Sequence, residues 1–363
     1  MFPRGCSMNR STKTSGRRDG APVSLTREVI EKFGDRYKIE YPTAEKVLWL
    51  SRVMQAISVS PLAGDFALVG GSALVFLYRD LYRFSTDLDL DFIGNPQLGR
   101  RGNAEVTARI TSDRAKLKQL AHDLGMRFVT PSRATDRFVQ YRLEYRSEYT
   151  RTDAVELDLS YRYCHSVLGA VHRQWPLSIE GFLPRFKVQT LTQEELYASK
   201  LTAMVEGKER LDFPDKIGLM FKRKIRHLFD VYLLADDVLR GDSPVNLKRL
   251  HNLVVLFGLT RIRNFEFFRG NAIGSYVEED IRRELKSVLP RGMPIPKVKD
   301  MKWQVRKFFD KHLYNWSERE HRFVEDFRAG NFRPEDIFGT GPVARGLHGM
   351  QYYREILEKV QTI

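Results

Sequence analysis

The segment "DLDLDF", from Asp87 to Phe92, alternates three aspartates with three apolar residues. Alternation with a period of two predicts a β-strand whose leucines and phenylalanine face the core, while the carboxylates project together from the other face. Like charges held this close raise one another's proton affinity. The segment therefore needs a cationic partner, and this need constrains the fold and chemistry of the chain more than any other feature.

A divalent metal ion is the simplest such partner. Mg²⁺ prefers a few carboxylate oxygens and completes its coordination with water and substrate phosphates. Asp87 and Asp89, joined by a third carboxylate on a neighbouring strand, can hold two such ions around an in-line phosphoryl displacement. We predict Asp158 in "VELDLSYR" as the third ligand, with Glu156 as the alternative if the register differs by one pair. Mn²⁺ is expected to substitute for Mg²⁺.

An edge strand with its acidic residues in solvent is the simpler interpretation of an isolated DxDxD pattern. An EF-hand loop is excluded, because Phe92 and Leu98 stand where such a loop needs Gly and Glu. Only the residues around the segment can separate the edge strand from a metal site.

The residues upstream favour a metal site that handles phosphate. Gly70 and Gly71 follow the short apolar run "FALV" and open a predicted helix, so backbone amides can approach a phosphate closely. Ser72 adds a hydroxyl to this turn, and Arg83 and Ser85 stand just before the aspartates. We predict that these five residues contribute to a nucleotide-binding site.

The chain divides into three parts by pattern. Residues 1–24 are basic and rich in serine, which predicts a disordered tail. Residues 25–190 mix helical patterns with alternating runs near 137–147, 153–162 and 185–191, which predict an α/β lobe with a mixed sheet. Residues 191–363 show almost only helical patterns and predict a helical lobe. The fold class is therefore α+β.

Charge and cysteine content narrow the partners and the compartment. The net charge of +14 over 363 residues suits a polyanionic partner such as nucleic acid. Cys6 and Cys164 give neither a metal-binding spacing nor a disulfide framework, which predicts a reducing compartment. The longest apolar run, residues 66–78, is too short to cross a bilayer. We expect a cytoplasmic protein that does not contact membranes.

The stretch "GGSALVFLYRDLYRFSTDLDLDF" resembles the first motif of the polymerase-β-like nucleotidyltransferases. It is most similar to the AbiEii/AbiGii branch, the toxins of type IV toxin–antitoxin and abortive-infection systems. The resemblance implies a palm-like mixed sheet, followed by helices, on which two aspartates bind Mg²⁺ and a nucleoside triphosphate. The positions that match the motif are Gly70, Gly71, Ser72, Arg83, Ser85, Asp87 and Asp89.

A second resemblance lies further along, in "SKLTAMVEG" and "IRHLFDVYLL". It implies that Lys200 contacts the triphosphate and that Asp230 shapes the nucleotide pocket. Arg226 also matches this pattern, whereas His227 stands where the family usually has an aspartate. The resemblance further implies that Asp158 is the third palm carboxylate.

The family resemblance implies transfer of a nucleoside monophosphate from an NTP to an acceptor, with release of pyrophosphate. The favoured acceptor is RNA, with tRNA the leading candidate, and a cognate antitoxin is a possible partner. Two basic runs that contain aromatic residues, 221–227 and 282–309, suit phosphate contact and base stacking. A small-molecule or protein acceptor, or a non-catalytic RNA-binding module on the same fold, stays open as an alternative.

Overall fold

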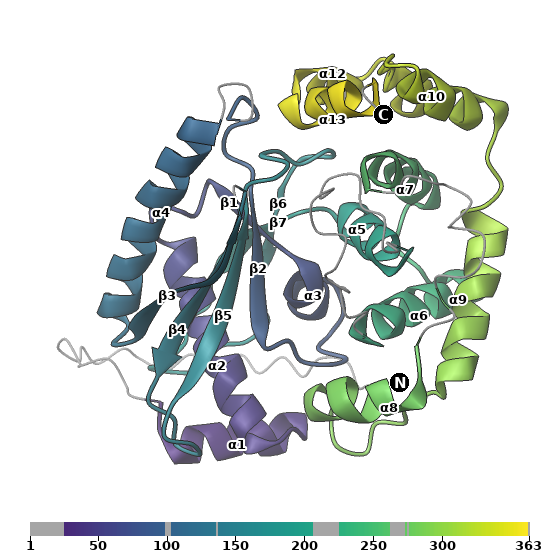
Figure 1. Ribbon diagram of the computed structural model, residues 1–363. Helices are drawn as coiled ribbons and strands as arrows, with labels where there is room; N and C mark the ends of the chain where they lie inside the picture. Colours follow the sequence, from purple (N-terminus) through teal and green to yellow (C-terminus); the bar gives the residue numbers. More distant parts are fainter. Residues whose placement is uncertain are drawn as a thin grey trace, which may run out of the picture.

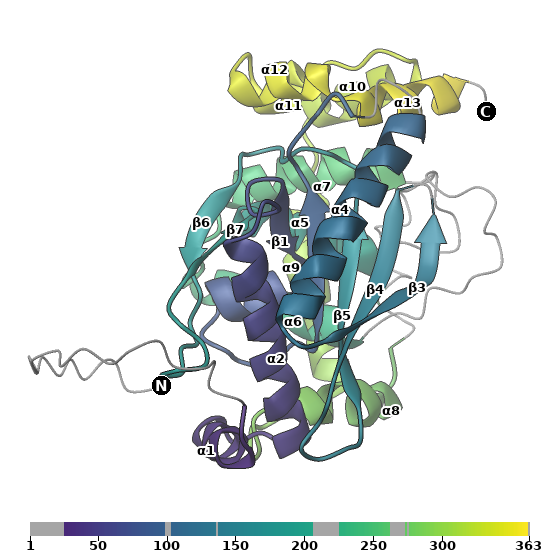
Figure 2. The ribbon, with the colours of Figure 1, turned by 90° about the vertical axis from the view of Figure 1, so that its left-hand side faces the viewer.

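The computed structural model describes residues 25–98, 103–135, 137–205, 225–261, 273 and 276–361, so the predicted disordered tail lies outside the described residues. Within them, seven strands form one mixed sheet with helices on both faces (Figures 1 and 2). The strands are β1 (Phe66–Val69), β2 (Asp87–Phe92), β3 (Arg127–Thr135), β4 (Phe138–Tyr145), β5 (Asp153–Ser160), β6 (Val171–Gln174) and β7 (Lys187–Thr190). The helices are α1 (Arg27–Tyr37), α2 (Tyr41–Ser58), α3 (Gly70–Ala73), α4 (Asn103–Asp123), α5 (Gln193–Val205), α6 (Ile225–Arg240), α7 (Leu247–Arg261), α8 (Glu278–Asp280), α9 (Val298–His312), α10 (Glu318–Arg328), α11 (Glu335–Phe338), α12 (Pro342–Gly349) and α13 (Gln351–Gln361).

The acidic strand β2 lies in the interior of the sheet. The strand order is β3-β4-β5-β2-β1-β7-β6, with β2 antiparallel to β1 and parallel to β5. Both edges of β2 are therefore hydrogen-bonded, and the edge-strand interpretation of its aspartates is wrong. An α+β fold with a mixed sheet followed by helices is confirmed.

The two faces of β2 meet different layers. Leu88, Leu90 and Phe92 are buried, and the ring of Phe92 lies 4.6 Å from the guanidinium carbon of Arg109 on α4. The aspartates alternate with these residues and are partly exposed, and Oδ2 of Asp89 lies 2.0 Å from where a Cβ on Gly70 of α3 would stand. The alternation predicted from the sequence thus separates the core from the acidic face.

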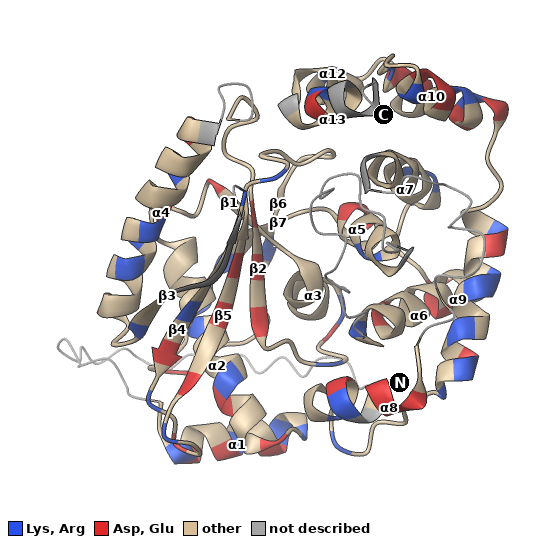
Figure 3. Cartoon of the chain, in the orientation of Figure 1, with Lys and Arg blue, Asp and Glu red and all other residues tan. Residues whose placement is uncertain are grey.

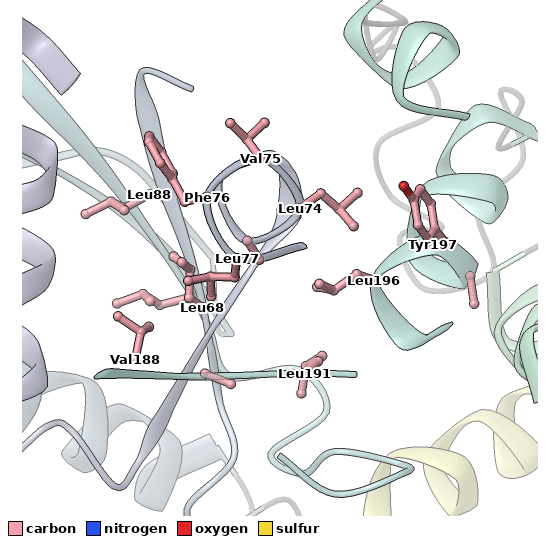
Figure 4. Packing of buried hydrophobic residues seen from close by; sticks show 14 of the residues in the cluster. Leu68, Leu74, Val75, Phe76, Leu77, Leu88, Val188, Leu191, Leu196 and Tyr197 are labelled. Atoms are coloured by element: carbon pink, nitrogen blue, oxygen red, sulfur yellow. The ribbon is translucent and has the colours of Figure 1, made fainter. Parts of the chain in front are cut away.

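The helix that follows the glycines is held between the sheet and α5. It begins as α3 and continues as a π-helical turn, Leu74–Tyr78, whose four apolar residues before Tyr78 are buried. Leu74 points toward Leu196 on α5, with Tyr197 beside it (Figure 4). The predicted helix over 72–82 ends early, because Asp80 and Leu81 adopt positive φ angles of 21° and 55°, which no α-helix allows.

Helices dominate beyond β7, as predicted. The chain passes from the end of β7 at Thr190 to the start of α5 at Gln193 within two residues. Helices α10 to α13 form a layer at one end of the molecule, above α7 in Figure 1. An ion pair of 2.9 Å between Arg137 and Glu355 joins this layer to the β3–β4 turn. A lobe boundary near residue 190 stays a prediction, and none of the described helices is long and apolar enough to span a membrane.

Candidate active site

Three carboxylates come together on two neighbouring strands. Asp89 on β2 and Asp158 on β5 are direct cross-strand partners, and Asp87 pairs in the same way with Glu156. Neighbouring strands lie about 4.8 Å apart, so the side chains of Asp89 and Asp158 stand next to each other. All three aspartates are partly exposed, while the apolar residues that alternate with them are buried. The predicted register, with Asp158 rather than Glu156 beside Asp89, agrees with this arrangement.

The donor set suits a hard cation such as Mg²⁺. Carboxylate oxygens on adjacent strands are the ligands that this ion prefers. Within the described ranges, no three His, Cys, Asp or Glu side chains already converge on a single point that could hold a metal. Two of the aspartates are turned toward neighbouring donors, because the Ser85 hydroxyl donates to Asp87 over 2.9 Å and the Gln140 amide donates to Asp158 over 2.7 Å. The chemistry of these carboxylates therefore fits Mg²⁺, while a bound ion stays a prediction.

The glycine pair makes room for two site residues. Gly70 has a φ of +67°, and a Cβ built there would lie 2.0 Å from Oδ2 of Asp89. A Cβ on Gly71 would lie 2.7 Å from Nη2 of Arg83. The sequence suggested glycine here for close approach of a phosphate, and the structure adds a second reason, which is the position of Asp89 and Arg83.

Ser72 and Ser85 lie inside the frame of the site. Both are buried. The hydroxyl of Ser72 donates to the backbone carbonyl of Asp87, which ties α3 to β2. That of Ser85 donates to the carboxylate of Asp87. In this arrangement both hydroxyl protons serve to fix Asp87, and the predicted contact of these serines with phosphate stays a prediction.

Asp230 on α6 is the centre of a buried charge cluster. It is fully buried, and among the described residues four donors reach its carboxylate, as many as its lone pairs accept. Arg83 contributes Nε at 2.8 Å and Nη2 at 2.9 Å, Lys200 contributes Nζ at 2.7 Å, and Tyr82 contributes its hydroxyl. The carboxylate thus positions Arg83, Lys200 and Tyr82, and its predicted role in the nucleotide pocket stays a prediction.

The pKa values of the cluster follow from burial and from its uneven charge. Burial alone would raise the pKa of Asp230, but Arg83 and Lys200 outweigh it and hold this pKa well below its ordinary range. Burial lowers the pKa of Lys200, and attraction to Asp230 offsets only part of this, because Arg83 repels the ammonium. The predicted triphosphate ligand Lys200 therefore lies in a place that a further anion would stabilise.

The cluster is electrically coupled to the acidic strand. Asp89 raises the pKa of Lys200, although burial has the larger, opposite effect. Arg226, at the first turn of α6, lies with Nη2 3.8 Å from Oδ2 of Asp87. Lys200, Asp230 and Arg226 come from α5 and α6, which follow the sheet in sequence, and Figure 3 shows both helices on the same side of β2 as α3.

Several residues of the site were not predicted from the sequence. Gln140 lies on β4 as the direct cross-strand partner of Asp158. Arg79 is bound to α5 and α6, because its Nε donates to the hydroxyl of Tyr197 over 2.5 Å and its Nη2 pairs with Asp237. The alternating pattern of β4 marks Gln140 as outward-facing, but only the strand register shows which residue it meets.

Comparisons with known proteins agree with this geometry. A family model described as "Nucleotidyl transferase AbiEii toxin, Type IV TA system" matches residues 52–311, which include the acidic strands and the buried charge cluster. Among solved structures, the fold resembles MenT4, a nucleotidyltransferase toxin from Mycobacterium tuberculosis H37Rv. The TM-score is 0.56 and the identity 17 %, and the match covers 83 % of this chain and 94 % of that chain. No curated protein sequence matches the chain.

Proposed function

Because this chain belongs to the AbiEii family of nucleotidyltransferase toxins of type IV toxin–antitoxin systems, we propose that it transfers a nucleoside monophosphate to a hydroxyl of RNA. In this reaction the acceptor oxygen attacks the α-phosphorus of an NTP, the bond from that phosphorus to the β-phosphate oxygen breaks, and pyrophosphate leaves. The observation that carries the proposal is the pairing of Asp89 with Asp158 on adjacent strands, opposite Lys200.

The carboxylates hold the metal and receive the proton. Asp87, Asp89 and Asp158 would hold Mg²⁺ beside the NTP phosphates, and Asp158 would also take the proton of the acceptor hydroxyl. Bound Mg²⁺ neutralises charge on the phosphates and favours the ionised acceptor oxygen. Ser85 and Gln140 fix the orientation of these carboxylates through the bonds at 2.9 Å and 2.7 Å.

Lys200 and the glycine turn bind the triphosphate. Lys200 donates one N–H to Asp230, and its other two N–H groups remain to contact the phosphates. The amides of Gly70 and Gly71 lie at the start of this helical segment, and we assign them to the phosphates as well. Arg83 acts as a brace between the acidic strand and α6, because its guanidinium is buried against Asp230.

The acceptor and partners follow from charge and family. The family implies a nucleotide substrate and a cognate antitoxin. The net charge of +14 supports a polyanionic acceptor, and tRNA is our leading candidate. Since NTPs and tRNA are both present in the cytoplasm, we place the reaction there.

The test is incubation of the purified protein with Mg²⁺, total RNA and each α-³²P-labelled NTP in turn. We expect label in an RNA band of tRNA size with one or more of the nucleotides. Asp87→Asn and Asp89→Asn should each lower the rate at least a hundredfold, since removal of one ligand disables metal and phosphate positioning together. Asp80→Asn, which removes the same charge from an exposed position before the strand, is the matched control and should keep the wild-type rate.

Full activity in the Asp87 or Asp89 variant would overturn the assigned site. Label on a small molecule or protein, with none on RNA, would keep the enzyme class and replace the acceptor. No transfer to any acceptor by a folded wild-type protein, across all four NTPs and with Mn²⁺ as well as Mg²⁺, would contradict the proposed reaction.

A further inference from the structure

Helix α9 has two sharply different faces. Its buried face packs on α6, where the side-chain amide of Gln304 donates to Asp236 over 2.7 Å. Two acidic residues, Asp300 and Asp310, share its exposed side with five residues that repeat at helical spacing, Lys299, Trp303, Arg306, Lys307 and Lys311. We call these five residues the α9 stripe. Basic positions follow the outer side of α9 in Figure 3.

An unusually exposed aromatic ring lies in the middle of the stripe. Trp303 is 64 % exposed, although tryptophan is normally among the best buried side chains. The ammonium of Lys307 lies over one face of its indole ring, 5.3 Å from the ring centre, and most of the ring remains in solvent.

The positive charge of the stripe is balanced only in part within the described ranges, where Asp300 and Asp310 are the acidic residues on the same exposed side of α9. Across those residues, none of Lys299, Arg306, Lys307 and Lys311 forms an ion pair. Many other exposed basic residues do so, for example Lys32 with Glu28 at 2.7 Å. Burial and the nearby charge of Arg306 lower the pKa of Lys302, which lies beside the stripe. The four cations of the stripe outnumber Asp300 and Asp310 on the same side of the helix, so this surface keeps a net positive charge that an anion would relieve.

We propose that the α9 stripe is a docking surface for unpaired RNA, with a base stacked on Trp303 and phosphates on the surrounding lysines and Arg306. This inference rests on the proposed function and assigns part of the acceptor contact to a surface outside the candidate active site. A planar indole and a row of cations are complementary to a base and a sugar–phosphate chain. An acidic protein partner would complement the charge but would leave the exposed ring without a matching planar group.

The geometry of the helix sets the size of the bound segment. From Lys299 to Lys311 the helix rises about 18 Å, at about 1.5 Å per residue. The stripe lies on the far side of α6 from the acidic strand, because α9 packs on α6 and Asp230 of α6 faces Arg83. An acceptor that reaches both places must pass at least one helix diameter, about 10 Å, so the stripe would bind a part of the RNA distant from the reacting hydroxyl.

Binding of fluorescently labelled total tRNA, measured by anisotropy across a salt series, tests the proposal. Trp303→Leu should weaken binding about tenfold through loss of one stacked base, and Trp303→Phe should restore most of it. The association constant should fall less steeply with salt in the double variant Lys299→Gln/Lys307→Gln. The magnitude of the slope of its logarithm against log salt should decrease by about 0.7 for each phosphate that the protein no longer neutralises. Each variant should bind NTP, measured separately, as the wild type does.

The matched control is Arg114→Gln/Lys118→Gln. These two exposed basic residues lie one turn apart on α4, on the opposite side of the molecule from α9 (Figure 1), and their loss should leave RNA binding almost unchanged.

If the wild type binds and labels RNA while the α9 variants bind it equally well, the stripe is not an RNA surface, and an acidic protein becomes the expected partner of the stripe. If the wild type neither binds nor labels RNA, the RNA acceptor and the docking surface are both wrong. Equal weakening in the α9 and α4 variants would also overturn the proposal, because it would show diffuse attraction without a defined surface.

Discussion

At the scale of single residues, the site depends on groups that make room for carboxylates and on groups that orient them. Gly70 belongs to the first kind, since its missing side chain is where Oδ2 of Asp89 lies. Gln140 belongs to the second, since its amide fixes Asp158. Neither residue carries charge, yet each sets the position of a carboxylate that we assign to the reaction.

Gly70→Ala should lower the rate of nucleotidyl transfer by at least tenfold. The new Cβ would stand 2.0 Å from Oδ2 of Asp89, so the carboxylate must turn away. Gly125→Ala is the matched control, because Gly125 has a φ of +68° but nothing within 4 Å of its Cβ. Both variants carry similar backbone strain of about 1–2 kcal/mol, and thermal unfolding should show similar losses. Equal loss of activity in both would show that strain, and not the position of Asp89, decides the outcome.

Gln140→Leu should raise the Mg²⁺ concentration needed for half-maximal rate several-fold. The leucine fills similar space but cannot donate to Asp158, so the carboxylate loses a fixed orientation. Arg142→Leu, two residues further along the same strand and opposite Glu156, is the control and should leave the Mg²⁺ titration unchanged. A Gln140 variant with a wild-type titration would show that the bond at 2.7 Å has no part in metal binding.

At the scale of elements, the segment between the π-helical turn and β2 aligns the acidic strand with the helices. Arg79 bonds to Tyr197 and Asp237, and Arg83 bonds to Asp230. The amide of Phe84 donates to the carbonyl of Val288 over 2.7 Å, which ties the same segment to the chain before α9. The positive φ angles of Asp80 and Leu81 are the strained backbone that lets the chain reverse between these anchors.

Local pattern was sufficient to predict the elements that are half-buried or amphipathic. The strands β2 and β4 alternate strictly, and β5 does so from Val155 onward. The sequences of α6 and α9 show a clear helical period. The edge strands β3 and β6 were missed. β3 contains Pro131, and β6 reads "VHRQ", which is largely exposed, so neither shows the apolar alternation that identifies a strand.

The sequence was less informative about contacts between elements. The acidic motif and Lys200 could be identified as site candidates from their order in the chain. The partners of Arg83 and Gln140 could not, because they depend on strand register and on the docking of α6, which bring together residues 18 and 147 positions apart. The same limit applies to residues 221–224 of the predicted basic run, which lie outside the described residues.

At the scale of the whole molecule, Asp230 joins the sheet layer to the helices that follow it. Asp230→Asn would leave Arg83 and Lys200 buried with no anion between them, and should lower the free energy of unfolding at pH 7 by about 3–5 kcal/mol. Urea unfolding measures this loss. Asp242→Asn, which removes a carboxylate that is 69 % exposed just after α6, should change stability by less than about 1 kcal/mol.

The effect of Asp230→Asn should depend on pH in a defined direction. Burial opposes the charge, but the two cations dominate and the folded-state pKa of Asp230 lies below its ordinary value of 3.8. The ionised carboxylate therefore stabilises the fold fully above that pH, and its contribution is lost as the pH falls further. The difference between wild type and variant should be constant from pH 6 to pH 8 and shrink below about pH 4. A difference that grows on acidification would contradict the ion-pair assignment.

Asp158 is the carboxylate of β5 that we place beside Asp89 in the reaction. A comparison of two acids on β5 tests this assignment. We would measure the initial rate of transfer from the α-³²P-labelled NTP for Asp158→Asn and Glu156→Gln, which neutralise carboxylates two residues apart on the same face. We expect a loss of at least about a hundredfold for Asp158→Asn and a rate within about twofold of wild type for Glu156→Gln. The reverse order, or no loss in Asp158→Asn, would show that the reaction does not use the carboxylate beside Asp89.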